Sequence, residues 1–144
     1  MNERNRQPRD EGSITLFACV ASVGLLVMLG LVVDGGVKAR AIQQADRIAA
    51  EAARSGGQAI DVRAAINGSL PVLDSSAARR DAQAYLNGEG VTGTVEVEDG
   101  GRALTVTVSS ASPTVFLGLV GVDSLKVTGT ATVSLVRGVT GAER

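Results

Sequence analysis

The residue types that carry out most enzyme chemistry are scarce in this sequence. The chain contains no histidine, the commonest general base and metal ligand of proteins. Its single cysteine, Cys19, lies inside a long apolar run, where a reactive thiolate is disfavoured. A lone cysteine also cannot form a disulfide within the chain. We therefore interpret Cys19 as a small apolar residue of that run.

The positions of the carboxylates fit helix caps, turns and exposed strand faces better than they fit a catalytic site. Four aspartates stand beside expected turns and helix starts: Asp61, Asp74, Asp81 and Asp123. Glu96 and Glu98 share the solvent face of one expected strand and could approach a cation, but two exposed carboxylates are usually only surface. The stretch 118–121 lacks the Lys and Ser/Thr of a phosphate-binding loop. We predict a non-enzymatic protein with no cofactor, no metal site and no small-molecule substrate.

Charge and aromatic content argue against a nucleic-acid-binding protein. The formal net charge is -1, and the acidic and basic residues are interspersed. Aromatic side chains for stacking on bases are limited to Phe17, Phe116 and Tyr85. The function therefore depends on how the chain is built and anchored.

The most distinctive segment is a charge-free run from Ile14 to Val33. At about 1.5 Å per helical residue, it reaches roughly 30 Å, the thickness of the hydrocarbon core of a bilayer. A cleaved secretory signal is the main alternative, but it would end in small residues at a cleavage site, whereas this run leads through Asp34 into more helix-forming sequence. We predict a single membrane-spanning helix over residues 13–33. Basic residues on both flanks, including Arg4 and Lys38, leave its orientation undecided.

Beyond the span, the pattern predicts a helix packed on a small sheet. Residues 37–54 contain strong helix formers, with small apolar residues on one face. Gly35-Gly36 is the one place between the span and this helix where a bend is expected. Gly56-Gly57 is expected to end the helix. A turn of helix is expected over 62–66, and Asp74 is expected to cap a second helix over 75–86. Apolar and polar residues then alternate over 94–98, 104–109 and 125–135, which predicts three antiparallel strands. The fold class is therefore α+β, with a long N-terminal helix covering about three strands.

An apolar, glycine-rich segment, 113–122, separates the second and third strands. It is too short to span a membrane. We interpret it as a core-packing turn or short helix, with a membrane-surface or subunit-contact patch as the alternative. In the span itself, Ala18 and Ser22 have small-xxx-small spacing, with Ala21 and Gly24 nearby, and such positions allow another helix to approach closely.

Several segments resemble the TadE/TadG-like pseudopilins, which are minor components of tight-adherence (Tad, or Flp) pilus systems. The resemblance covers 10–13, 33–36 and 41–50, and extends through 116–124 into 127–131. It implies a single-pass protein of the bacterial cell membrane, with the N-terminus in the cytoplasm and the residues after Asp34 outside. It also implies cleavage by a prepilin peptidase after Gly12, which would leave Ser13 as the new N-terminus.

The residue pattern and the resemblance together predict a division of the chain and a set of partners. The expected segments are a cytoplasmic leader (1–12), the transmembrane helix (13–33), a helical extension (34–57), an extracytoplasmic α+β domain (58–137) and a flexible tail (138–144). The implied partners are membrane lipid, other pilus-assembly or minor pilin subunits, and a prepilin peptidase. An anchored envelope or adhesion domain unrelated to pili is the alternative function.

One position departs from the family. Members usually carry a glutamate five residues into the mature chain, thought to pair with the N-terminal amine of a neighbouring subunit, and this sequence has Phe17 there. The resemblance is therefore closest to the TadG-like members. It favours an anchor that recruits partners over a subunit of the pilus shaft.

Overall fold

The computed structural model describes residues 11–66, 70–98 and 100–135. Its dominant element is one helix, α1 (Glu11–Gly56), of 46 residues. It contains no proline, and it continues through Gly35 and Gly36 without interruption. It ends at the expected glycine pair, where the Gly57 N–H donates to the Ala53 carbonyl at 2.8 Å.

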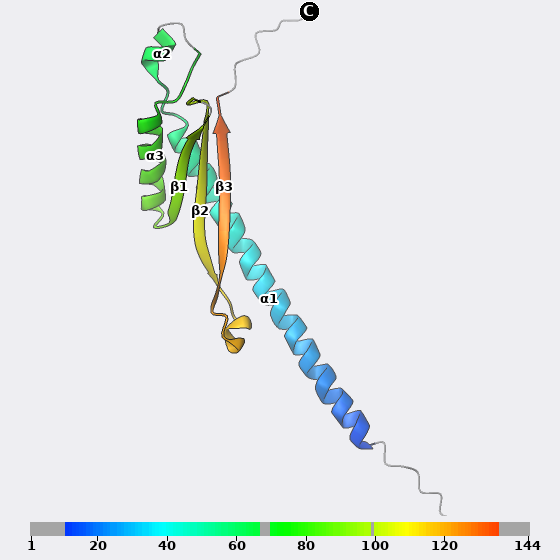
Figure 1. Cartoon of the computed structure of the whole chain (residues 1–144). Coiled ribbons are helices and arrows are strands. Elements are labelled where there is room, and N and C mark those ends of the chain that lie inside the picture. The colour runs from blue at the N-terminus through cyan, green and yellow to red at the C-terminus, as the bar shows by residue number, and fades with distance from the viewer. Residues whose placement is uncertain (1–10, 67–69, 99, 136–144) are drawn as a thin grey trace, which may run out of the picture.

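The sheet is an antiparallel meander of β1 (Thr92–Glu98), β2 (Ala103–Pro113) and β3 (Ser124–Ser134), in the order β1-β2-β3. Gly100 and Gly101 have positive φ of 64° and 92° and make the turn between the first two strands. Because β1 begins at Thr92, opposite Ser109, β2 extends beyond it and pairs only with β3 over its last residues. This extension carries the β2–β3 connection toward the middle of α1 (Figure 1).

Two shorter helices precede the sheet, and aspartates cap both. Asp61 accepts the backbone N–H groups of Arg63 and Ala64 at the start of α2 (Val62–Ile66). Asp74 accepts those of Ser76 and Ala77 at the start of α3 (Ser75–Gly88). The capping roles predicted for these two aspartates are therefore confirmed.

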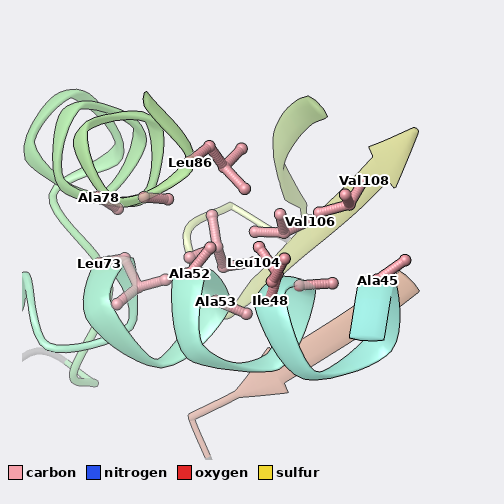
Figure 2. Packing of buried hydrophobic residues seen from close by; sticks show 12 residues of the cluster. Ala45, Ile48, Ala52, Ala53, Leu73, Ala78, Leu86, Leu104, Val106 and Val108 are labelled. Carbon is pink, nitrogen blue, oxygen red and sulfur yellow. The ribbon is translucent and has the colours of Figure 1, made fainter. Parts of the chain in front are cut away.

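The core lies between one face of the sheet and the C-terminal half of α1, with α3 completing the cover over β1 (Figure 1). The close-up in Figure 2 shows the small side chains of α1 facing the inward residues of β2, with Leu86 of α3 beside them. The α1 residues buried in this core are Ala45, Ile48, Ala49, Ala52 and Ala53. The face predicted from the alanine spacing is the face that packs.

Small residues allow the backbones to come unusually close. A Cβ added to Gly129 of β3 would lie 2.3 Å from the backbone carbon of Ala45, so no side chain fits between β3 and α1 at that point. A Cβ added to Gly56 would lie 2.5 Å from the Ala78 carbonyl oxygen, where α1 crosses α3. The helix extension is thus a structural part of the folded unit.

The predicted α+β fold, with a long apolar N-terminal helix and a three-stranded antiparallel sheet, is confirmed. The predicted turn of helix over 62–66 is present as α2. Most of the predicted leader (1–12) and the whole of the predicted tail (138–144) lie outside the described residues.

Candidate functional site

The N-terminal half of α1 has almost no protein around it. In its most apolar 18-residue window only 6% of the residues are buried within the chain. Side chains such as Val20, Leu26 and Leu31 are more than half exposed. Among the described residues, α1 is the one helix long and apolar enough to cross a membrane. Helices of soluble proteins usually bury such a face, so this half of α1 is a candidate membrane span by its length and composition.

The apolar run ends at a buried carboxylate, Asp34, which is only 3% exposed. Its Oδ1 accepts the backbone N–H of Val115 at 2.7 Å, and its Oδ2 accepts that of Leu117 at 2.7 Å. Both oxygens lie within 3.2 Å of the Phe116 nitrogen. A single side chain therefore binds three successive N–H groups of the β2–β3 connection, which is more than 80 residues away in the sequence.

The same connection packs on α1 one turn before Asp34. A Cβ added to Gly30 would lie 2.7 Å from the Phe116 ring, so the absence of a side chain at Gly30 makes room for the aromatic group. Gly30 is buried, although its neighbours along the helix are exposed. We call this arrangement of Gly30, Asp34 and residues 115–117 the Asp34 clip.

The clipped connection is a compact turn with an apolar surface. It contains a short 3₁₀ helix, η1 (Leu117–Val120), followed by Gly121 with a φ of 88°. Its ends are joined by a hydrogen bond from the Thr114 N–H to the Asp123 carbonyl at 3.1 Å. The short helix agrees with one of the two predicted forms, but no residue of η1 is buried, so the expected packing into the core is wrong. The reason is that β2 and β3 extend past the core, which leaves the connection beside α1 instead of above the sheet.

The predicted helix-packing residues lie in the exposed half of α1. Ala18, Ser22 and Gly24 are exposed, and Ala21 is half-buried. The Ser22 hydroxyl donates to the Ala18 carbonyl at 2.7 Å, which satisfies its donor inside the helix. A Cβ at Gly24 would meet nothing within 4 Å. These positions are accessible to another helix, and their role in packing stays a prediction.

The predicted cleavage site and Phe17, which stands where family members carry a glutamate, lie near the start of α1. Gly12 and Ser13 belong to its first turn, directly ahead of the apolar run. Phe17 is 74% exposed, so the described part of the chain leaves most of this side chain uncovered. Cleavage after Gly12 also stays a prediction.

No catalytic arrangement emerges from the described polar residues. Glu96 and Glu98 are exposed on the outer face of β1. Within the described ranges, no group of three His, Cys, Asp or Glu side chains lies close enough to hold a metal ion. A groove of about 340 Å³ lies between α1 and the end of β2, and its described lining holds Arg40, Gln44 and Ser112 but no carboxylate.

Sequence reasoning missed the Asp34 clip. Its signal was available, because Asp34 is the first charged residue after a long apolar run, where a polar group needs a partner. The partner could not be found in the sequence, since it consists of backbone N–H groups in a distant turn.

Comparison with known proteins gives one family. Residues 12–59 match the model of the Tad family, described as putative Flp pilus-assembly TadE/G-like. The match begins at the predicted cleavage glycine and ends just after α1, so it covers the apolar run, the Asp34 clip position and the alanine face. No curated protein and no solved structure gives a significant match to the chain.

Proposed function

Because residues 12–59 match the TadE/G-like Flp pilus-assembly family model, we propose that this chain is a membrane-anchored pseudopilin or minor component of Tad/Flp pilus assembly. The family match supports involvement in pilus assembly, contact with other pilus components and a structural role. The finer role, an anchored minor subunit without enzymatic activity, is our proposal.

The observation that carries the proposal is the division of α1 into two halves. Its N-terminal half is apolar and exposed, and its C-terminal half is buried under the sheet. A rigid helix of this kind joins a membrane segment to a folded domain without a flexible linker. Such a design suits a subunit that must present a domain at a fixed position on a membrane.

In the proposed topology, the chain crosses the membrane once in residues 13–33. The N-terminus is cytoplasmic, and the helical extension (34–57) and the α+β domain (58–137) are outside the bacterial cell membrane. Partner subunits would contact the helix through Ala18, Ala21, Ser22 and Gly24, where small side chains permit close approach. Phe17 cannot pair with the N-terminal amine of a neighbour, which favours a permanent anchor over a shaft subunit.

The leader would be removed by a prepilin peptidase between Gly12 and Ser13. Intact-mass measurement of the protein extracted from its native membrane tests this step. We expect a mature chain that begins at Ser13. A native chain that still begins at Met1 or Asn2 would rule out cleavage but would leave the anchoring role unaffected.

Deletion of the gene tests the assembly role. We expect loss or strong reduction of surface pili, with recovery when the gene is supplied in trans. Recovery should fail when the apolar half of α1 is replaced by a cleavable signal that releases the domain. Unchanged piliation in the deletion strain would contradict the proposal.

A second candidate is an anchored adhesive or envelope-interaction domain unrelated to pili. The observation that favours it is the uncovered face of the sheet, where Thr105 and Thr132 share a hydrogen bond of 2.9 Å between exposed side chains. Normal piliation together with lost surface attachment in the deletion strain would favour this function.

A further inference from the structure

The turn between β2 and β3 presents apolar side chains that nothing in the described chain covers. Leu119 is 82% exposed, Val120 is 75% exposed and Val115 is 59% exposed. No charged residue occurs from Thr114 to Val122. A small monomeric domain rarely projects such a cluster into water, so the cluster indicates a contact surface.

The Asp34 clip fixes this turn at the end of the membrane-spanning run. Hydrogen bonds from three N–H groups to Asp34, together with the Phe116–Gly30 contact, attach the turn to α1 at two successive helical turns. Gly30 lies about 6 Å before Asp34 along the helix axis. Phe116 therefore lies at the depth of residues that belong to the apolar run, below the level at which charged residues begin.

Most backbone N–H groups of the turn are already hydrogen-bonded within the chain. The N–H groups of Val115, Phe116 and Leu117 bind Asp34. Those of Leu119, Gly121 and Val122 bind carbonyls within the turn at 3.0–3.1 Å. Unsatisfied backbone polar groups are costly in hydrocarbon, so the bonds of these six N–H groups lower the cost of bringing this backbone to the bilayer boundary.

We propose that the turn Val115–Val122 is a second membrane contact, which inserts Leu119 and Val120 into the bilayer leaflet on the Asp34 side. The inference rests on the proposed spanning role of α1. The occupant of the surface is lipid because the turn is held against α1 at the depth of its apolar run, where the helix itself is in lipid. Lys38 lies one helical turn after Asp34 on α1, and Lys126 is the third residue of β3. Both residues come after apolar segments of the chain, where a long cationic side chain can extend to lipid phosphates.

Two contacts with one membrane have a structural consequence. A helix alone leaves its domain free to tilt and rotate about the helix axis. The inserted turn fixes the domain against the membrane surface and occupies the Gly30 and Asp34 face of α1. Extraction of the subunit into a filament would have to remove both elements from the bilayer, which accords with an anchor that remains in the membrane.

Tryptophan fluorescence in the full-length protein tests the inference, because the chain contains no tryptophan of its own. Leu119→Trp, Leu26→Trp and Val62→Trp would each be reconstituted into phosphatidylcholine–phosphatidylglycerol vesicles, with and without brominated phosphatidylcholine. Leu26 reports the span, and Val62, 64% exposed at the far end of the domain, is the control in water.

We expect blue-shifted emission and strong bromolipid quenching for Leu119→Trp and Leu26→Trp, and neither effect for Val62→Trp. Quenching of Leu26→Trp without quenching of Leu119→Trp would overturn the inference and leave the anchor intact. Blue-shifted but unquenched Leu119→Trp would also overturn it, because the turn would then be covered by protein. If Leu26→Trp is not quenched either, the spanning role fails and the inference fails with it.

Discussion

Individual aspartates bind backbone N–H groups at three places that connect or begin elements of this chain. Asp34 connects two segments that are far apart in sequence, and Asp61 and Asp74 each begin a helix. All three are carboxylates that accept backbone N–H groups, and such charge-assisted hydrogen bonds are roughly twice as strong as neutral ones. The capping roles could be predicted from neighbouring turn residues. The role of Asp34 could not, because no local pattern identifies its partners.

Removal of the Asp34 carboxylate should release the β2–β3 turn. In Asp34→Ala, the N–H groups of Val115, Phe116 and Leu117 lose their acceptors, so their hydrogen exchange should become several-fold faster. Asp34→Asn keeps one acceptor oxygen and should have an intermediate effect. Amide exchange measured by mass spectrometry on the full-length protein checks this order, with Asp81→Asn on the exposed surface of α3 as the control. Equal exchange in all variants would show that the clip does not hold the turn.

The N-terminus of α3 should weaken in acid. The Ser76 hydroxyl bond, followed by the Ala77 and Ser76 N–H bonds, lowers the pKa of Asp74 below its ordinary value of 3.8. A lowered pKa in the folded state gives stabilisation that is complete above the unfolded pKa and is lost as the pH falls through the folded one. Exchange at Ser76 and Ala77, corrected for its intrinsic pH dependence, should therefore accelerate only below about pH 4. In Asp74→Asn this pH dependence should disappear.

The elements differ in how well the sequence predicted them. The alanine face of α1 and the alternation in β3 each mark one buried face, so the packing of helix on sheet followed directly from periodicity. The turn at 113–122 was misplaced, because its apolar residues look the same whether they face a core or a membrane. Its position depends on how far β2 and β3 extend beyond the core. The alternation of apolar and polar residues did not predict the length of that extension.

The closest contact between elements is predicted to be the least tolerant of change. Gly129→Ala introduces a methyl group where α1 leaves no room, so β3 must move away from Ala45. We expect a loss of about 1–3 kcal/mol in the free energy of unfolding. Denaturant titration of the full-length protein in detergent, followed by circular dichroism, measures it. Gly88→Ala, at the end of α3 where a Cβ meets nothing within 4 Å, should change stability much less.

At the scale of the whole molecule, the chain is a membrane segment and a folded domain built on one helix. The core of the domain is small and consists mostly of alanine, valine and leucine. Among the described residues, the Asp34 clip joins the domain to the end of the apolar half of α1. Most of the circumference of the helix between residues 14 and 29 is therefore accessible to lipid or to other helices. Specific assembly must depend on which side of this helix a partner recognises.

Ala18 and Ser22 define the side on which we expect a partner helix. They stand one turn apart, and the Ser22 hydroxyl is bound to the Ala18 carbonyl, so this side offers a smooth surface of small groups. Ala18→Ile should hold the partner helix away and strongly reduce copurification of other pilus-assembly subunits from membranes. Val27→Ile is the matched control, because it lies about two and a half turns further on, on the opposite side of the helix. Both variants should insert and fold normally, since neither site contacts the domain. Equal copurification with Ala18→Ile and the unmodified chain would show that partners bind elsewhere and would direct attention to the domain surface.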